Sequence, residues 1–300
     1  MFGPRVWAEV DGESIWFESS DLSLRPAPEA FAGALLIPAL ARRAKISIDA
    51  PLSPLWRLHL TMVLKILNEW WDYPQLEPEA AQGSWTTPQV TEPTSKTALC
   101  FSGGVDSFYS LLRGPYPIDQ IVFVHGYDIP IDDAARMSAM QASLHAVSAA
   151  CGVTPVVIRT NLRQHPLLTN VSSVRSDGAA VAAIGHLLPE AVRRLVVSST
   201  YPYFVDRPWG SHWRLDELWS SERLHVAHYG ASMWRADKLR AIAHEPLVRA
   251  HLRVCCKTCK TRRLPGNCSA CEKCLRTMLV LAQEGQLEHF PVFEHEGLTQ

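Results

Sequence analysis

The chain has 300 residues, 47% of them hydrophobic, which is enough for a sizeable core and for one large α/β domain with an appendage. Its 29 lysines and arginines nearly balance its 30 aspartates and glutamates, so no overall positive field favours nonspecific nucleic-acid binding. The amino terminus lacks the pattern of a secretory signal, and the longest apolar run, Ala30 to Ala41, is too short to span a bilayer. We expect a soluble, cytoplasmic protein with no membrane partner.

Residues 1–72 are expected to form an α+β appendage. Asp11-Gly12, a dipeptide typical of tight hairpin turns, separates two strand-like stretches. In residues 53–71 apolar side chains recur every three or four positions, which predicts a helix whose buried face contains Leu55, Leu58, Met62, Ile66 and Trp70. Residues 73–96 contain four prolines and little periodicity, so they are expected to be a linker or a surface loop.

From residue 97 the pattern changes to short apolar strands that alternate with helices. Strands are predicted at 97–102, 120–126, 153–160 and 193–200, and helices at 106–113, 132–151 and 178–188. This alternation predicts an α/β domain over residues 97–250, with a doubly wound parallel sheet and helices on both faces. Ligands of such sheets bind beyond the carboxyl ends of the strands.

The sequence Ser-Gly-Gly-Val-Asp-Ser, residues 102–107, follows the first of these strands and opens a helix. The glycines let an anion approach the first-turn amides, and the helix dipole favours negative charge there. A phosphate or pyrophosphate site is therefore predicted, with an ordinary strand-to-helix turn as the alternative. The common P-loop is excluded because no lysine follows the glycines, and Asp106 is compatible with polyphosphate when Mg²⁺ lies between them.

In this context the hexapeptide resembles the signature of the ATP pyrophosphatase (PP-loop) family. Members share a doubly wound fold, the adenine nucleotide alpha hydrolase-like fold, and cleave ATP between the α and β phosphates while adenylating a substrate oxygen. The resemblance implies ATP and Mg²⁺ as cofactors and a nucleotide-binding domain over residues 97–250. It implies that the backbone near His125 and Gly126 lies close to the nucleotide, and that the pyrophosphate end is held by Ser102, Gly103, Gly104, Val105, Asp106 and Ser107.

Six of the eight cysteines lie between residues 255 and 274, which indicates a metal site rather than disulfides in a chain without an export signal. Cys268, Cys271 and Cys274 have the spacing of zinc ligands, and an iron–sulfur cluster or unliganded buried cysteines are the alternatives. The fourth ligand could be Cys255, Cys256 or Cys259, and Cys255 is preferred because it ends a strand-like stretch. Residues 251–300 are assigned to a zinc-binding segment and a C-terminal helix.

Within the PP-loop family, the glycine turn followed by this cysteine run resembles the 7-cyano-7-deazaguanine synthases. Those enzymes convert a carboxylate into an amide and then a nitrile, using ammonia and ATP. The resemblance covers residues 97–285 and implies that Lys238 neutralises phosphate charge and that Arg175 is the remnant of a substrate segment. For Lys238, a surface lysine without such a role is the alternative. The catalytic residues implied are therefore Asp106, Lys238 and Arg175. The first 96 residues have no counterpart in that family, which leaves the substrate open.

Residues 198–222 pack three tryptophans, two tyrosines, two arginines and a histidine into 25 positions after the fourth predicted strand. Aromatic walls with a few polar groups suit a small-molecule pocket. The substrate candidates are Tyr201, Trp209, His212 and Asp216. A cap whose aromatic side chains fill the core is the alternative interpretation.

These features predict an ATP-dependent, AMP-forming ligase that adenylates a carboxylate or amide for attack by ammonia or an amine, giving an amide or a nitrile. The expected partners are a small-molecule or peptide carboxylate and an amine donor, and the protein could form a homodimer. A tRNA-thiolating or lysidine-type enzyme is the second hypothesis, favoured only by four basic residues in 257–263 and opposed by the neutral charge. A non-catalytic nucleotide-binding scaffold is the third.

Overall fold

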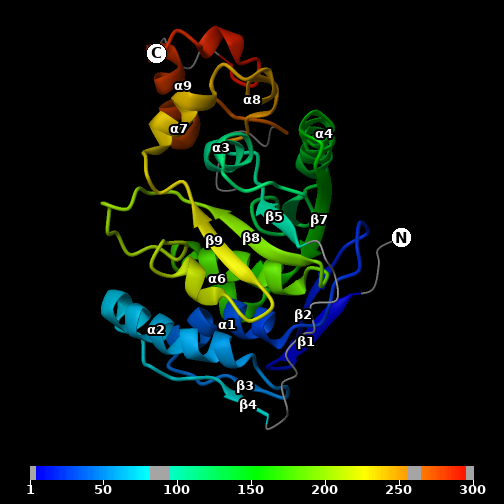
Figure 1. Cartoon of the computed structure of the whole chain (residues 1–300), viewed down its shortest axis with the longest axis vertical. Helices are drawn as coiled ribbons and strands as arrows, with labels where there is room; N and C mark the ends of the chain where they lie inside the picture. Colours follow the sequence, from blue (N-terminus) through cyan, green and yellow to red (C-terminus); the bar gives the residue numbers. More distant parts are fainter. Residues whose placement is uncertain (1–4, 82–94, 170, 256–264, 295–300) are drawn as a thin grey trace.

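The computed structural model describes residues 5–81, 95–169, 171–255 and 265–294. Its strands are β1 (Val6–Val10), β2 (Glu13–Glu18), β3 (Ser47–Ile48), β4 (Glu79–Ala80), β5 (Lys96–Cys100), β6 (Gln120–His125), β7 (Thr154–Thr160), β8 (Val192–Ser198) and β9 (His225–Tyr229). Seven of them form one sheet in the order β1-β2-β7-β6-β5-β8-β9, while β3 pairs with β4 (Figure 1). Strands β5 to β9 run parallel, and β1 and β2 are antiparallel additions at one edge. The protein is therefore α/β with a mostly parallel central sheet.

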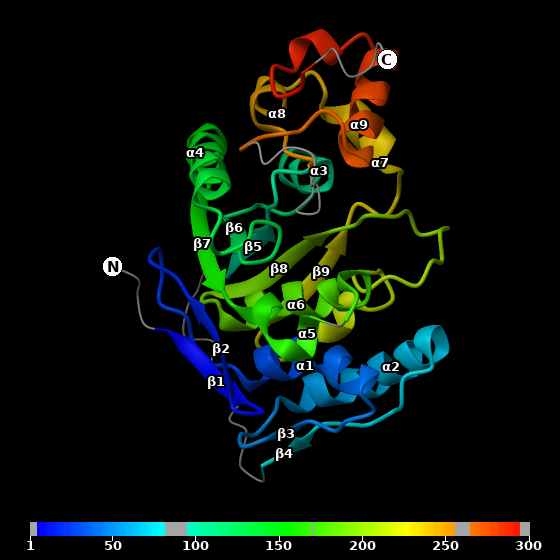
Figure 2. The ribbon, with the colours of Figure 1, turned by 180° about the vertical axis from the view of Figure 1, so that it is seen from behind.

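Helices cover both faces of this sheet (Figures 1 and 2). One face carries α1 (Pro28–Ala41), α2 (Pro54–Trp71), α5 (Pro166–Thr169) and α6 (Ser173–Leu187); the other carries α3 (Val105–Arg113), α4 (Ala134–Cys151), α7 (Arg235–Ile242), α8 (Pro246–His251) and α9 (Glu272–Gln283). Neighbouring residues of β5 point into different cores, Ala98 toward α1 and α6 and Leu99 toward α3 and α4. Both layers are apolar, because a parallel sheet needs cover on both faces. None of the described helices combines the length and apolarity that crossing a membrane requires.

The strand order reverses at β5. After β5 the chain adds β6 and β7 on one side, and then crosses over to place β8 and β9 on the other. Such a reversal leaves a crevice beyond the carboxyl ends of the two strands that it separates. Because β5 runs directly into the two glycines that precede α3, the fold places the glycine turn at this crevice.

The strands predicted after residue 97 are confirmed as β5, β6, β7 and β8, and the three predicted helices as α3, α4 and α6. Strand β9 was not predicted, because its five residues, His-Val-Ala-His-Tyr, contain two histidines and only one β-branched side chain. Its parallel pairing with β8 supplies the register that its own sequence does not specify.

The predicted N-terminal hairpin is confirmed, with both turn residues, Asp11 and Gly12, at positive φ. Its relation to the rest of the chain differs from the expected appendage. Strand β2 pairs with β7 through Phe17 and Glu18, so the hairpin extends the central sheet, and α1 packs against α6 in the same core. The edge of β7 provides the unpaired backbone groups that make this addition favourable.

Helix α2 lies where the sequence predicts it but buries a different face. Leu58 and Met62, predicted to be buried, are 65% and 48% exposed. The buried residues are Trp56, Leu60, Val63, Leu64, Ile66 and Leu67. Of the predicted face, Ile66 is buried and Leu55 and Trp70 are partly buried, so the prediction is wrong for Leu58 and Met62. Apolar residues occur at helical spacing on two faces of α2, and the face with Trp56 packs against Trp219, with 6.5 Å between ring centroids.

His186, near the end of α6, is buried, and no acidic side chain in the part of the chain that the structure describes forms an ion pair with it. Its Nε2 donates to the carbonyl of Trp219 at 2.9 Å. The neighbouring Arg223 guanidinium is also buried and donates to the carbonyls of Gly185 and His186, both at 2.9 Å. Burial lowers the pKa of His186 to about 3, and Arg223 adds to the lowering.

Acid should therefore destabilise the fold through His186. Its unfolded-state pKa is about 6.5, so the unfolded protein binds more protons than the folded protein until the pH falls to the folded value. The free energy of unfolding should begin to decrease as pH drops through about 6.5, and His186 should account for about 2 kcal/mol of the decrease by pH 5. Denaturant titrations at pH 7 and pH 5 measure this. His186→Gln keeps a donor for the Trp219 carbonyl but does not titrate. Between pH 7 and pH 5, its free energy of unfolding should therefore decrease by about 2 kcal/mol less than that of the unmodified chain. Equal losses would contradict the assignment.

Candidate functional site

The glycine turn, residues 102–107, connects β5 to α3. Gly103 has a φ of 73°, a left-handed conformation that favours glycine, and Gly104 is the N-cap of α3. The Gly104 amide donates to Ser102 Oγ at 3.4 Å, and Ser107 Oγ donates to the Gly104 carbonyl at 3.0 Å. The residues predicted from Ser102 to Ser107 are thus gathered around the N-terminus of α3, where first-turn amides have no acceptor within the helix.

Asp106, in the first turn of α3, pairs with two cations from α7. Arg235 donates to Asp106 Oδ2 through Nε at 2.9 Å and Nη2 at 2.5 Å, and Lys238 Nζ lies 3.3 Å from Oδ1. Lys238 also donates to the carbonyl of Ser199, directly after β8, at 2.6 Å. Asp106 follows β5, and Lys238 is hydrogen-bonded to the residue after β8. The structure therefore brings this predicted pair together between the two strands at which the strand order reverses.

Arg235 was not predicted from the sequence, although it stands one helical turn before Lys238 and so shares its face of α7. Lys238 is almost fully buried, and burial lowers the pKa of its ammonium group while Asp106 opposes that shift. A cation with so little water around it interacts strongly with any anion that enters the site. Asp106 therefore holds both cations beside the N-terminus of α3, with Arg235 39% exposed and Lys238 buried.

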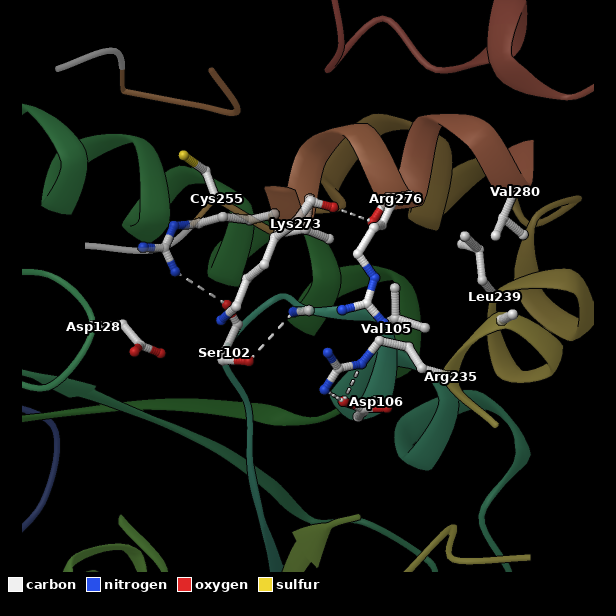
Figure 3. Close-up of a pocket in the computed structure, with 15 residues that line it drawn as sticks. Ser102, Val105, Asp106, Asp128, Arg235, Leu239, Cys255, Lys273, Arg276 and Val280 are labelled. Carbon is white, nitrogen blue, oxygen red and sulfur yellow. Dashed lines mark hydrogen bonds and ion pairs between the residues drawn. The ribbon is translucent and has the colours of Figure 1, made fainter. Parts of the chain in front are cut away.

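A cavity of about 180 Å³ opens beside Asp106, between the glycine turn and the C-terminal segment (Figure 3). Ser102, Gly104 and Val105 form its wall on the side of the turn. Its charged lining comprises the basic residues Arg235, Arg253, Lys273 and Arg276 and the acidic residues Asp106 and Asp128. Since Asp106 is already paired with Arg235, the cavity carries an excess of positive charge and suits an anion.

His125 and Gly126, the residues expected near the nucleotide after β6, make contacts within the sheet layer. The His125 ring nitrogen Nε2 lies 2.9 Å from the carbonyl of Pro130. Gly126 has a φ of 114°, and a Cβ at this position would lie 2.1 Å from the Thr160 carbonyl oxygen, so only glycine fits. Among the described residues of this loop, Asp128 lines the cavity, whereas His125 and Gly126 do not.

Arg175, an expected catalytic residue, lies at the start of α6 on the opposite face of the sheet from α3 and α7. It donates to the Tyr73 hydroxyl at 2.9 Å, and its guanidinium lies 5.5 Å from the ring centroid of Trp71. These contacts join α6 to the end of α2. The structure does not bring Arg175 together with Asp106 and Lys238.

The four substrate candidates in residues 198–222 fall into two groups. Tyr201 and Trp209 are partly exposed, pack edge to face at 5.5 Å, and have the Arg207 guanidinium within 5.9 Å and 5.8 Å of their ring centroids. The other two, His212 and Asp216, are buried. Tyr201 and Trp209 are therefore partly accessible from solvent, but none of the four candidates lines the cavity beside Asp106.

Asp216 anchors this loop to the sheet. Its carboxylate accepts from Ser211 Oγ at 2.8 Å and is 2.7 Å from His228 Nδ1 on β9. The ring of His212 packs 4.9 Å from that of Trp70, and burial lowers the pKa of His212. These contacts give His212 and Asp216 a role in holding the loop.

Four cysteines form a cluster in which all the sulfur atoms lie within 4.8 Å of one another: Cys255, Cys268, Cys271 and Cys274. The Sγ–Sγ distance is 3.5 Å between Cys271 and Cys274, 3.9 Å between Cys268 and Cys274, and 4.0 Å between Cys255 and Cys271. Thiolates about 2.3 Å from a tetrahedral zinc ion would stand about 3.8 Å apart. The cluster could therefore hold a metal such as zinc. Cys256 and Cys259 lie outside the described residues.

Asn267 fixes the shape of this cluster. Its Oδ1 accepts from the amides of Val254 and Cys255 at 2.8 Å and 3.2 Å, and its Nδ2 donates to the Leu252 carbonyl at 2.8 Å. The Cys271 amide donates to Cys268 Sγ at 3.3 Å, a contact that supports a metal-bound thiolate. Asn267 was not predicted from the sequence. The one sequence feature that could have indicated its role is its position immediately before Cys268.

Comparison of the chain with family models, with curated proteins and with solved structures gives no match. Its function is therefore argued from the chemistry of the glycine turn, the cavity and the cysteine cluster.

Proposed function

We propose that the protein is an ATP-dependent, AMP-forming ligase of the PP-loop class. It binds the β and γ phosphates of ATP at the glycine turn and adenylates a carboxylate or amide of its substrate for attack by ammonia or an amine. The observation that carries the proposal is the convergence of Asp106, Arg235 and Lys238 at the N-terminus of α3. The strand order and the helices on both faces support the doubly wound interpretation of the sheet.

The chemistry follows from where charge accumulates. Attack by a substrate oxygen on the α phosphorus forms a new P–O bond, breaks the bond to the bridging oxygen, and leaves the additional negative charge on pyrophosphate. The first-turn amides of α3 and the Arg235 guanidinium line the cavity and would stabilise that charge in the transition state. Lys238 is buried outside the cavity lining, where it would add positive charge behind Asp106.

Mg²⁺ bound with ATP would neutralise phosphate charge, and oxygen ligands are what it prefers. The carboxylates of Asp106 and Asp128 on the cavity wall fit that requirement. Asp128 is exposed, whereas Asp106 already holds Arg235 and Lys238. Asp106 therefore orients the two basic side chains, and Asp128 is the more accessible of the two carboxylates.

The direct test is to incubate the protein with ATP, Mg²⁺, ammonium and a panel of carboxylates, and to quantify AMP and pyrophosphate. Equal amounts of both products are expected, with one AMP for each amide formed and two for each nitrile. Lys238→Met should abolish their formation, whereas Lys65→Met, on the exposed face of α2, should not.

Two other outcomes discriminate the alternatives. ADP and phosphate as the sole products would exclude the PP-loop assignment. ATP binding without release of pyrophosphate across the panel would favour the nucleotide-binding scaffold. The basic stretch that favours a tRNA-modifying enzyme, residues 257–263, lies outside the described residues, and pyrophosphate release that requires added tRNA would support that hypothesis.

A further inference from the structure

Helix α9 faces the glycine turn across the cavity. Lys273, Arg276, Thr277 and Val280 of α9 line the cavity on one side, and Ser102, Gly104, Val105 and Asp106 line it on the other. Figure 3 shows Lys273 and Arg276 on the side of α9 that faces the turn. Two elements that lie more than 160 residues apart in sequence thus contribute to one basic cavity.

The start of α9 belongs to the cysteine cluster. Cys271 is the N-cap of α9 and Cys274 lies in its first turn, so Lys273 stands between two of the four clustered thiols and Arg276 follows the second. A metal held by these thiols would fix both the position and the rotation of the first turns of α9. The directions in which Lys273 and Arg276 leave the helix are therefore set at the cluster.

The cluster is also tied to the glycine turn through the backbone. The Arg253 amide donates to the Gly103 carbonyl at 2.8 Å, and Asn267 holds the amides of Val254 and Cys255. Cys255 is both a member of the cluster and part of the cavity wall. The spacing between the two sides of the cavity is thus defined by a short chain of contacts that passes through the cluster.

The two basic side chains of α9 are available to bind an anion. Lys273 is exposed and has no ion pair within the described part of the chain, and Arg276 pairs at 3.2 Å with Glu272 of the same helix. The side chains of Arg276 and Glu272 are 71% and 82% exposed, and a pair this exposed is weak enough for an anion to displace. An ammonium and a guanidinium from α9 would complement the amides and cations on the other side.

We propose that Lys273 and Arg276 form the second half of a polyphosphate site whose first half is the glycine turn, and that metal in the cysteine cluster sets the affinity of this site. The location of the phosphates rests on the function proposed above. The cysteine segment then has a direct part in ligand binding, because it positions two of the groups that contact the phosphates.

Calorimetric titration with inorganic pyrophosphate tests the proposal without requiring turnover. Lys273→Gln and Arg276→Gln should each weaken binding about five- to tenfold, and the double variant at least about thirtyfold, as expected for charge-assisted hydrogen bonds. Lys65→Gln and Arg57→Gln, on exposed positions of α2, are the matched controls and should stay within about twofold. All variants should retain the metal content of the unmodified protein.

Removing the metal with a chelator should weaken pyrophosphate binding at least about tenfold, and adding zinc back should restore it. Unchanged affinity in the double variant, or no binding of pyrophosphate by the unmodified protein, would overturn the proposal. Unchanged affinity after the metal is removed would overturn its second part. If pyrophosphate binding depends on Lys273 and Arg276 but ATP is never cleaved to AMP, the ligase function fails and the polyphosphate site stands.

Discussion

Asp106→Asn should lower the rate of AMP formation at least about a thousandfold. The asparagine keeps the shape of the side chain but removes the charge that holds Arg235 and Lys238 at the N-terminus of α3. Lys238 is buried, and without its carboxylate partner the pKa of its ammonium group would be lowered further. The measurement is the rate at which AMP and pyrophosphate appear at saturating ATP.

The matched control is Asp237→Asn. Asp237 lies on α7 between Arg235 and Lys238 in sequence, but it pairs with Arg240 at 2.9 Å on an exposed surface. This variant should retain activity within about twofold. Asp106→Asn should also keep its metal, since the cysteine cluster does not use Asp106. Activity near that of the unmodified protein in Asp106→Asn would remove the basis for a phosphate site at this turn.

The parts of the site that could be predicted from the sequence are those encoded locally. The conformation of Gly103, the helix that begins at Val105, and the Cys268–Cys274 spacing each depend on a few consecutive residues. The α/β pattern was predictable for the same reason, because each strand and helix after residue 97 carries its own periodicity.

What could not be predicted depends on contacts between distant segments. Arg235 reaches Asp106 only because α7 packs against α3, and nothing near either residue encodes that packing. Arg175 is a residue type that suits an anion site, but it lies on the opposite face of the sheet from Asp106, which its own sequence context does not reveal. The buried face of α2 was settled by Trp219, which lies far along the chain. The pairing of β2 with β7 likewise joins strands that are far apart in the sequence.

Cys274→Ser should remove the metal and destabilise the protein by at least about 3 kcal/mol, which corresponds to a decrease of about 5 °C in Tm for a chain of this size. Cys274 is fully buried against the core that contains Met278, Leu281 and Phe290, so a hydroxyl there also lacks water. Metal content by mass spectrometry and thermal unfolding measure the two effects. A colourless protein with one zinc per chain is expected, whereas visible absorption from iron would support the iron–sulfur alternative.

Cys151→Ser is the control that removes a cysteine without removing a metal ligand. Cys151 ends α4, is half-buried, and lies outside the four-cysteine cluster, so this variant should keep its metal and most of its stability. Retention of metal in Cys274→Ser would mean that Cys274 is not a required ligand. Loss of metal without loss of stability would mean that the packing around Asn267 and Phe290 holds α9 in place by itself. In that case the metal would not be what sets the directions of Lys273 and Arg276.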